Sequence, residues 1–455
     1  MKQWRIILTA CILAALLCCG AAAEEEAARS ELLLSGDGVY RYYVLPDGTA
    51  EIAGCITQET ELTVPAELDG HRVTRIGKGA FDVNRRALEK EDEWEDESSV
   101  QTGTVSRFTA ITLPEGVEEI GEEAFASCGK LVALTLPASV KRIEKRAFDH
   151  CRSLQQVDLP EGLEALGEEA FVSCDQLTSI RLPDHLQTLG SSLFSRCSAL
   201  TEVTLPAHLT ALPDSVFSGC ASLAEITLPA GITRISAGAF DGCKRLTAIH
   251  LSDTVVEIAD YAFNGCGELK EITLPASLKT IGKEAFAYCR KLQRVSIPEG
   301  VEKMGRAAFS FCNVLARVDL PASLTEIPEE AFTYCEELTE ISFPRGVTRI
   351  GASAFANCYA MAKITLPDTL LAVDENAFYG CAETKEIAVP EGVRTLGYGV
   401  FRYCQLLEEA SLPQSVEEIG GDVFYGCAKN LKITLKKGSF AEEYCKKNRL
   451  KYTAE

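Results

Sequence analysis

Basic residues are scarce in this sequence of 455 residues. Lysine and arginine number 45 against 66 aspartate and glutamate residues, so the formal net charge is −21 at pH 7. A field of this sign repels phosphate groups, which excludes nucleic acid and anionic membrane surfaces as the main partners. Hydrophobic residues make up 46% of the chain and charged residues 24%, a balance that excludes disorder along its whole length.

Side chains that carry catalysis are also few. The five histidines are His71, His150, His185, His208 and His250, which share no common spacing. The chain has no Gly-x-Ser-x-Gly elbow, no His-Glu-x-x-His helix and no phosphate-binding glycine loop. We therefore expect a protein that is not an enzyme and that uses neither a cofactor nor a metal ion.

The first 23 residues have the pattern of an export signal. Lys2 and Arg5 precede an uncharged run from Ile6 to Ala23, and three glutamates follow directly. This predicts a signal peptide over residues 1–23, followed by a linker over 24–35, and hence a secreted or cell-surface protein. An uncleaved anchor remains an alternative because 18 apolar residues just reach spanning length, and a lipid anchor is a third choice.

One residue type recurs with a fixed period through most of the chain. Fourteen cysteines follow one another at intervals of 23 residues, namely Cys128, Cys151, Cys174, Cys197, Cys220, Cys243, Cys266, Cys289, Cys312, Cys335, Cys358, Cys381, Cys404 and Cys427. The repeated unit reads C-x-x-L-x-x-I-x-L-P-x-x-L-x-x-I-G-x-x-A-F-x-x, and we number its positions from the cysteine. A fixed period in this range with L-x-x-L-x-L spacing is typical of a leucine-rich solenoid.

Each repeat predicts one coil of that solenoid. In the first full coil, Leu134 and Leu136 alternate with polar residues as in a short strand, which Pro137 ends. Ala147-Phe148 fits a helical turn whose ring fills the coil. Because one coil cannot bury all of its apolar groups, stacking is required. The predicted fold is a repeat solenoid with mixed α/β character, in which short parallel strands form one sheet and helical turns lie opposite.

The ends and one insertion depart from the repeat. We expect an N-terminal cap and first irregular coil over 36–84, an acidic loop over 85–107, the solenoid over 108–435 and a helical cap over 436–455. The sequence EKEDEWEDESS in the loop fits a solvated segment, with a cation-binding or docking loop as the alternative.

The pattern resembles the bacterial BspA-like leucine-rich repeat family, whose units share the L-P, I-G and A-F pairs with a nearby cysteine. The resemblance covers roughly residues 50–455. It implies a secreted or cell-surface protein that binds partners through its solenoid, with adhesion as the usual role.

The cysteines have two interpretations. An exported protein with many cysteines ordinarily forms disulfides. Equivalent side chains on stacked coils, however, lie about 4.8 Å apart with parallel Cβ vectors, which is beyond the distance that a disulfide needs. We therefore expect the fourteen repeat cysteines to form a structural ladder of buried free thiols.

Two surfaces are candidates for binding. The first is the exposed face of the sheet, represented by Thr135, Asp158, Arg181, Thr204, Thr227, His250, Thr273, Arg294, Ser296, Arg317 and Asp319. The second is an aromatic strip at the position before the cysteine, formed by Tyr288, Phe311 and Tyr334. Threonine is also explained by its strand propensity, and stacked rings by packing alone, so both structural explanations stay open.

The sequence thus predicts a non-catalytic scaffold that binds a protein or glycan on host or neighbouring cells. A membrane would be contacted only through an anchor, and we expect a monomer. A structural or self-assembling component of the cell envelope is the alternative.

Overall fold

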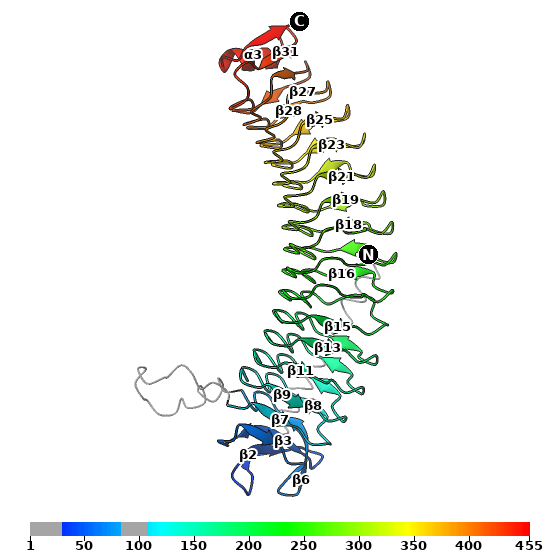
Figure 1. Cartoon of the computed structure of the whole chain (residues 1–455), viewed down its shortest axis with the longest axis vertical. Coiled ribbons are helices and arrows are strands. Elements are labelled where there is room, and N and C mark those ends of the chain that lie inside the picture. Colours follow the sequence, from blue (N-terminus) through cyan, green and yellow to red (C-terminus); the bar gives the residue numbers. More distant parts are fainter. Residues whose placement is uncertain (1–29, 83–106) are drawn as a thin grey trace, which may run out of the picture. The chain divides into compact units, whose positions relative to one another are not determined.

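The computed structural model describes residues 30–82 and 107–455, which form two compact units. Unit 1 contains the described residues up to Cys174 together with His185–Leu189, and unit 2 contains Asp175–Asp184 and Gly190–Glu455. Each unit is a stack of similar coils, drawn in Figure 1 as short arrows joined by turns. The predicted signal peptide and residues 85–106 of the predicted acidic loop lie outside the described residues.

Unit 1 combines a hairpin with two parallel ladders of short strands. The hairpin is β1 (Leu33–Leu34), β2 (Tyr40–Val44) and β3 (Ala50–Cys55), paired antiparallel. The first ladder is β4 (Glu61–Thr63), β7 (Ala110–Thr112), β9 (Ala133–Thr135) and β11 (Gln156–Val157). The second ladder continues from β3 through β6 (His71–Ile76), β8 (Glu119–Ile120), β10 (Arg142–Ile143), β12 (Ala165–Leu166) and β14 (Thr188–Leu189). A short strand, β5 (Glu67–Leu68), pairs antiparallel with β6.

Unit 2 repeats the two ladders. Strands at positions 6 to 8 of the coil are β13 (Ser179–Arg181), β15 (Glu202–Thr204), β19 (Arg294–Ser296), β21 (Arg317–Asp319), β23 (Glu340–Ser342), β25 (Lys363–Thr365), β27 (Glu386–Ala388), β29 (Glu409–Ser411) and β31 (Lys432–Leu435), which β32 (Tyr452–Ala454) follows. Strands at positions 15 and 16 are β16 (Arg234–Ile235), β17 (Glu257–Ile258), β18 (Thr280–Ile281), β20 (Lys303–Met304), β22 (Glu326–Ile327), β24 (Arg349–Ile350), β26 (Ala372–Val373), β28 (Thr395–Leu396) and β30 (Glu418–Ile419). Strands that pair within a ladder are parallel and lie one repeat apart, as in Arg294↔Arg317. The first ladder is interrupted between β15 and β19, because the coils that begin at Cys220, Cys243 and Cys266 have no strand at positions 6 to 8.

The solenoid fold is confirmed, but two details of the predicted coil are corrected. Most coils contribute to two ladders and not to one sheet, because the segment around position 16 also pairs with its equivalent, as Ile143 does with Leu166. The turn after this segment is not helical. The N–H groups of Glu123, Phe125 and Ser127 donate to carbonyls of the next coil at 2.7–2.9 Å. Since these N–H groups bond between coils, they do not form the i to i−4 bonds of an α-helix.

The turn is shaped by two left-handed residues in almost every coil. Positions 19 and 23 have positive φ angles, as in Arg146 (54°) and His150 (58°). Bonds of the i to i−3 type connect the residues between them, for example from Asp149 N–H to the Arg146 carbonyl at 3.0 Å. Left-handed residues thus recur within the turn, and every second N–H group points along the stack towards the next coil.

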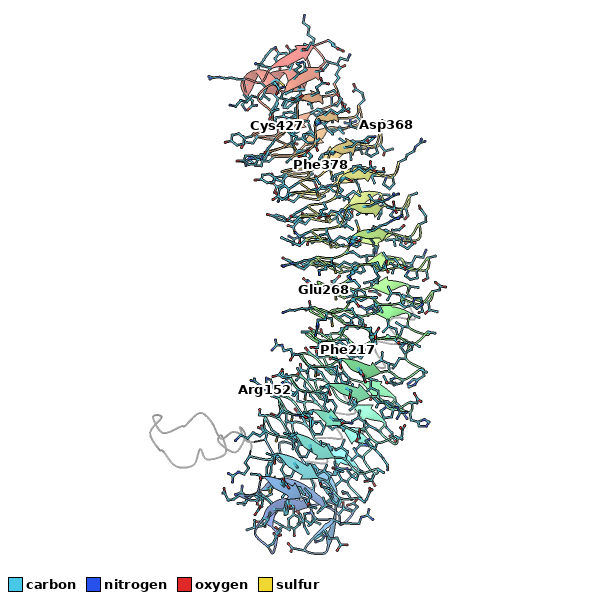
Figure 2. All side chains as sticks on the ribbon, viewed as in Figure 1. Arg152, Phe217, Glu268, Asp368, Phe378 and Cys427 are labelled. Carbon is cyan, nitrogen blue, oxygen red and sulfur yellow. The ribbon has the colours of Figure 1, made fainter. Side chains whose placement is uncertain are left out.

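A column of phenylalanine rings fills the core of each unit. The ring at position 21 stacks on its equivalents, with centroids 5.1–5.3 Å apart from Phe125 to Phe171 in unit 1. In unit 2 the distances from Phe194 to Phe424 are 5.1–5.9 Å. Phe217 and Phe378, labelled in Figure 2, are fully buried members of this column.

Both ends of the chain cover exposed strand edges. The sequence predicts a linker over 24–35, but Leu33–Leu34 form β1, because an unpaired β2 would leave a row of backbone groups without partners. At the other end, α3 (Phe440–Lys447) begins after Ser439, whose hydroxyl accepts a hydrogen bond from the Glu442 N–H. The strand β32 then pairs with β31 and extends the first ladder.

Candidate binding surfaces

The turns around seven successive cysteines of unit 2, from Cys289 to Cys427, each supply one aromatic side chain. These residues, which we call the aromatic band, are Tyr288, Phe311, Tyr334, Tyr359, Tyr379, Tyr403 and Tyr425. Four of them stand at position 23, and the other three stand at position 22 or position 2. The predicted strip of Tyr288, Phe311 and Tyr334 is thus one end of a longer row.

The rings of the band contact one another along the stack. Tyr288, Phe311 and Tyr334 are stacked face to face with centroids 4.6 Å apart at each step. Tyr403 meets Tyr379 and Tyr425 edge to face at 5.4 and 5.5 Å. These distances lie within the range of favourable aromatic pairs.

Tyr359 stands between the two groups of rings along the chain. Burial, together with the neighbouring Tyr334, Glu336 and Tyr379, raises the pKa of its hydroxyl. The side chains of Tyr288, Tyr359 and Tyr425 are 37%, 43% and 54% exposed, so the band offers flat apolar surface to solvent.

Four residues of the band occupy left-handed backbone. The φ angles are 59° at Tyr288, 58° at Phe311, 58° at Tyr334 and 61° at Tyr403. This conformation costs a bulky L-residue about 1–2 kcal/mol, whereas glycine adopts it freely. The equivalent position is glycine in other coils, including Gly242. Backbone preference therefore does not account for the aromatic residues, which contribute to the surface at a conformational cost.

The C-terminal end of the band surrounds a cation. The Arg402 guanidinium lies 5.0–5.7 Å from the ring centroids of Tyr398, Tyr403 and Tyr425. It donates a hydrogen bond to the Tyr398 oxygen at 2.9 Å, and the Tyr398 hydroxyl donates to Asp422 at 2.8 Å. Cation–π attraction of this kind fixes the rings in place.

The predicted sheet-face residues stand at positions 6 and 8 of the coil, and ten of the eleven are exposed. Seven of them lie in strands of the first ladder, whereas Asp158, Thr227, His250 and Thr273 lie outside its strands. Thr135 and Asp158 belong to unit 1 and the other nine to unit 2, where Asp319 is half-buried. Asp319 accepts hydrogen bonds from Arg294 at 3.0 Å and from Arg317 at 3.1 Å. The hydrogen bond from Arg294, with that from Arg317, lowers the pKa of the Asp319 carboxyl. These two arginines, which interrupt the polar row, are thus paired within the protein.

The repeat cysteines lie inside the coils. Their thiols donate to the carbonyl of the phenylalanine one coil earlier, for example from Cys312 Sγ to the Phe286 oxygen at 3.2 Å. Burial raises the pKa of Cys312 and Cys427 to about 12. A thiol held in its neutral form is a poor nucleophile and a poor metal ligand. Within residues 30–82 and 107–455, no cluster of three or more His, Cys, Asp and Glu side chains could hold a metal ion.

A depression with a volume of about 1120 Å³ adjoins the first ring of the band. Gly265 and Gly267 line it, together with Tyr288. Gly265 stands at position 23, where the next coil carries Tyr288, so the surface drops at the point where the row of rings begins. The labelled Glu268 of Figure 2 belongs to its lining.

Sequence reasoning missed part of the band and the depression. Tyr379 and Tyr425 stand one position earlier than the predicted column, so a count at position 23 alone does not find them. A count of aromatics over positions 22, 23 and 2 would have found all seven. The depression was signalled only by the change from glycine to tyrosine between positions 265 and 288.

The described residues place no membrane-spanning helix in the fold. In residues 30–82 and 107–455, no helix combines the length and the apolar character needed to cross a bilayer.

The two ladders, the buried phenylalanine column and the repeated turn define the class as a leucine-rich repeat solenoid. Residues 104–224, 210–339 and 325–449 match the family described as BspA type leucine rich repeat region (6 copies). The chain belongs to this family, whose fold is typically that of a binding scaffold.

Solved structures agree with this assignment. The chain is similar to a leucine-rich repeat protein from Bacteroides ovatus ATCC 8483, with 25% identity and a TM-score of 0.67 over 94% of this chain and all of the other. It is also similar to a leucine rich cell surface protein from Faecalibacterium prausnitzii A2-165, with 26% identity and a TM-score of 0.53 over 81% of this chain and 96% of the other. Among curated proteins there is no match.

Proposed function

We propose that this chain is a secreted or cell-surface, non-catalytic scaffold that binds a protein or glycan on host or neighbouring cells. The observation that carries this proposal is the aromatic band. Seven successive turns present a ring, and four of these rings occupy backbone that glycine would adopt at lower cost. Strained residues that the fold does not require are concentrated at functional surfaces.

The band is favoured over the sheet face as the binding surface. Arg294 and Arg317 of the sheet face are paired with Asp319, whereas Tyr359 and Tyr425 of the band expose a large part of their rings. Exposed aromatic side chains supply much of the energy of binding interfaces because they bury a large area with few rotatable bonds. Location at the cell surface is supported by the similarity to the leucine rich cell surface protein from Faecalibacterium prausnitzii.

Matched variants of the two surfaces test the proposal. Binding to epithelial and bacterial cells and to glycan and host-protein arrays would be compared for the wild-type chain, for Tyr359→Ser with Tyr425→Ser, and for Thr227→Arg with Thr273→Arg. We expect the tyrosine variant to bind at least about tenfold more weakly, since each lost aromatic anchor costs about 1–2 kcal/mol. The threonine variant should bind as the wild type does.

The opposite pattern would transfer binding to the sheet face, and a wild-type chain that binds none of these surfaces would overturn the proposal. Self-assembly is distinguished by sedimentation. We expect a monomer, since a net charge of −21 makes copies repel one another. An association that rises with concentration and disappears in the tyrosine variant would instead support an envelope component.

A further inference from the structure

The depression beside Tyr288 is lined in part by two glycines. Gly265 and Gly267 belong to this lining, and Lys244 and Arg290 line it from the coils before and after. Lys244, Gly267 and Arg290 all stand at position 2, so the backbones of the two cations are about 10 Å apart across two coil spacings. A Cβ at Gly265 would meet its nearest atoms in Gly242 at 3.5 Å, an ordinary contact. A side chain at position 265 would therefore have room, and it would fill part of the depression.

The lining is cationic in a strongly acidic protein. Four lysine and arginine side chains face two carboxylates, which gives a local net charge of +2 against −21 for the chain. Lys291 is paired with Glu268 at 3.0 Å. Lys244, Lys270 and Arg290 are exposed and form no ion pair with any residue that the structure describes. Three cations without protein partners around one hollow are complementary to an anionic ligand.

The shape of the site favours a sugar chain over a peptide. The depression is open and two glycines are part of its lining, so it offers no deep pocket for an anchoring side chain. The nearest strand, β19, pairs with β21 on one side and forms the bridge Glu271↔Arg294 with the preceding coil on the other, so a peptide cannot extend the ladder there as an added strand. At its rim, Tyr288 exposes 37% of its side chain, and the opposite face of its ring is stacked on Phe311. A rigid, flat ring of this kind can pack against the apolar face of a pyranose.

We propose that this depression binds an acidic oligosaccharide, in which a sugar ring packs on Tyr288 and carboxylate or sulfate groups are bound by Lys244, Lys270 and Arg290. This inference rests on the proposed scaffold function and specifies one ligand class for one end of the aromatic band. Guanidinium and ammonium groups form short, charge-assisted hydrogen bonds with such anions. Because the cations are exposed, the interaction weakens as salt is added.

Calorimetry with defined oligosaccharides tests the site. The probes are heparin-derived and polygalacturonate-derived oligosaccharides, neutral cello-oligosaccharides of the same length, and a poly-glutamate peptide. We expect binding of at least one acidic oligosaccharide, and much weaker binding of the neutral ones and of the peptide. Replacing Lys244, Lys270 and Arg290 together by glutamine should weaken binding at least about tenfold, because charge-assisted contacts are lost. Tyr288→Ser should weaken it several-fold.

Two control variants and one variant that fills the depression complete the test. Phe440→Ser removes an exposed ring of α3 that lies outside the aromatic band, and Lys363→Gln removes an exposed cation of the first ladder. Both should leave affinity unchanged. Gly265→Tyr should fold, since Tyr288 has the same coil position and a φ of 59° against 70° at Gly265, and it should abolish binding by filling the hollow.

Several outcomes would overturn the proposal. They are the absence of binding by every acidic oligosaccharide, equal binding of neutral sugars or of the peptide, and unchanged affinity in the glutamine variant or in Gly265→Tyr. If no acidic oligosaccharide binds while the chain still binds cells through Tyr359 and Tyr425, the proposed scaffold function is retained and only the proposed ligand class is wrong.

Discussion

The phenylalanine column predicts that a central ring stabilises the solenoid more than a terminal ring does. Phe286 is fully buried and stacks on Phe263 at 5.3 Å and on Phe309 at 5.1 Å. Phe424 is 5% exposed and stacks on a single ring, Phe401, at 5.9 Å. Truncating a buried phenylalanine to alanine costs about 3–5 kcal/mol, and each aromatic pair adds about 0.5–1.5 kcal/mol beyond the buried area. We therefore expect Phe286→Ala to lower the free energy of unfolding by about 4–5 kcal/mol and Phe424→Ala by about 3 kcal/mol.

Urea unfolding followed by circular dichroism measures both values, and the slope against urea shows whether the transition remains a single one. Hydrogen exchange locates the loss, since neighbouring coils carry the effect in a solenoid. Phe440→Ala is the control because this side chain is 43% exposed, and its cost should stay within about 0.5 kcal/mol. Equal costs for Phe286→Ala and Phe424→Ala, or less than about 2 kcal/mol for Phe286→Ala, would refute the argument from stacking.

The thiols, the helix cap and one carboxylate give three further tests. The repeat cysteines, such as Cys312, should not react with Ellman's reagent in the folded chain. After unfolding without reductant all of them should react. Cysteines that stay unreactive because they are cross-linked would contradict the ladder of free thiols. Ser439→Ala should lower the free energy of unfolding by about 1 kcal/mol in urea, and Ser439→Asp should restore it. Lys446 and the Gly438 N–H lower the pKa of Glu442 to about 2, so its stabilising effect is complete above pH 4.5 and is lost as the pH falls towards 2. Glu442→Gln should flatten the stability curve in that window, and a curve like that of the wild type would show that the hydrogen bonds contribute nothing.

The sequence predicts the solenoid because its period is unbroken and its inward positions are uniform. Phe148 and Cys151 lie where the repeat places them, inside the coil. The second ladder was not predictable from the same pattern. Its strands are two residues long, such as Arg142–Ile143, and two residues show no alternation. Val140 and Ile143 are apolar residues three positions apart, a spacing that does not by itself indicate a strand.

The left-handed turn residues were hidden for a different reason. Glycine is the usual signal for positive φ, yet Glu123, Ser127, Arg146 and His150 all adopt it. Bonds between coils enforce this geometry, as in Ser127 N–H to the Asp149 carbonyl at 2.7 Å. A single coil does not contain those partners, so no property of its own sequence reports the conformation.

This arrangement lets one position alter the surface without altering the fold. Position 23 keeps nearly the same φ whether it is Gly265 at 70°, Asn357 at 62° or Tyr403 at 61°, because the stack fixes the backbone there. The surface is hollow at Gly265 and carries an exposed ring at Tyr288, while the buried Phe and Cys columns continue beneath both. The residue at position 23 thus changes the surface of its coil while the backbone stays the same. The step from Gly265 to Tyr288, where cations without protein partners also gather, is for that reason the place where we expect a ligand to be recognised.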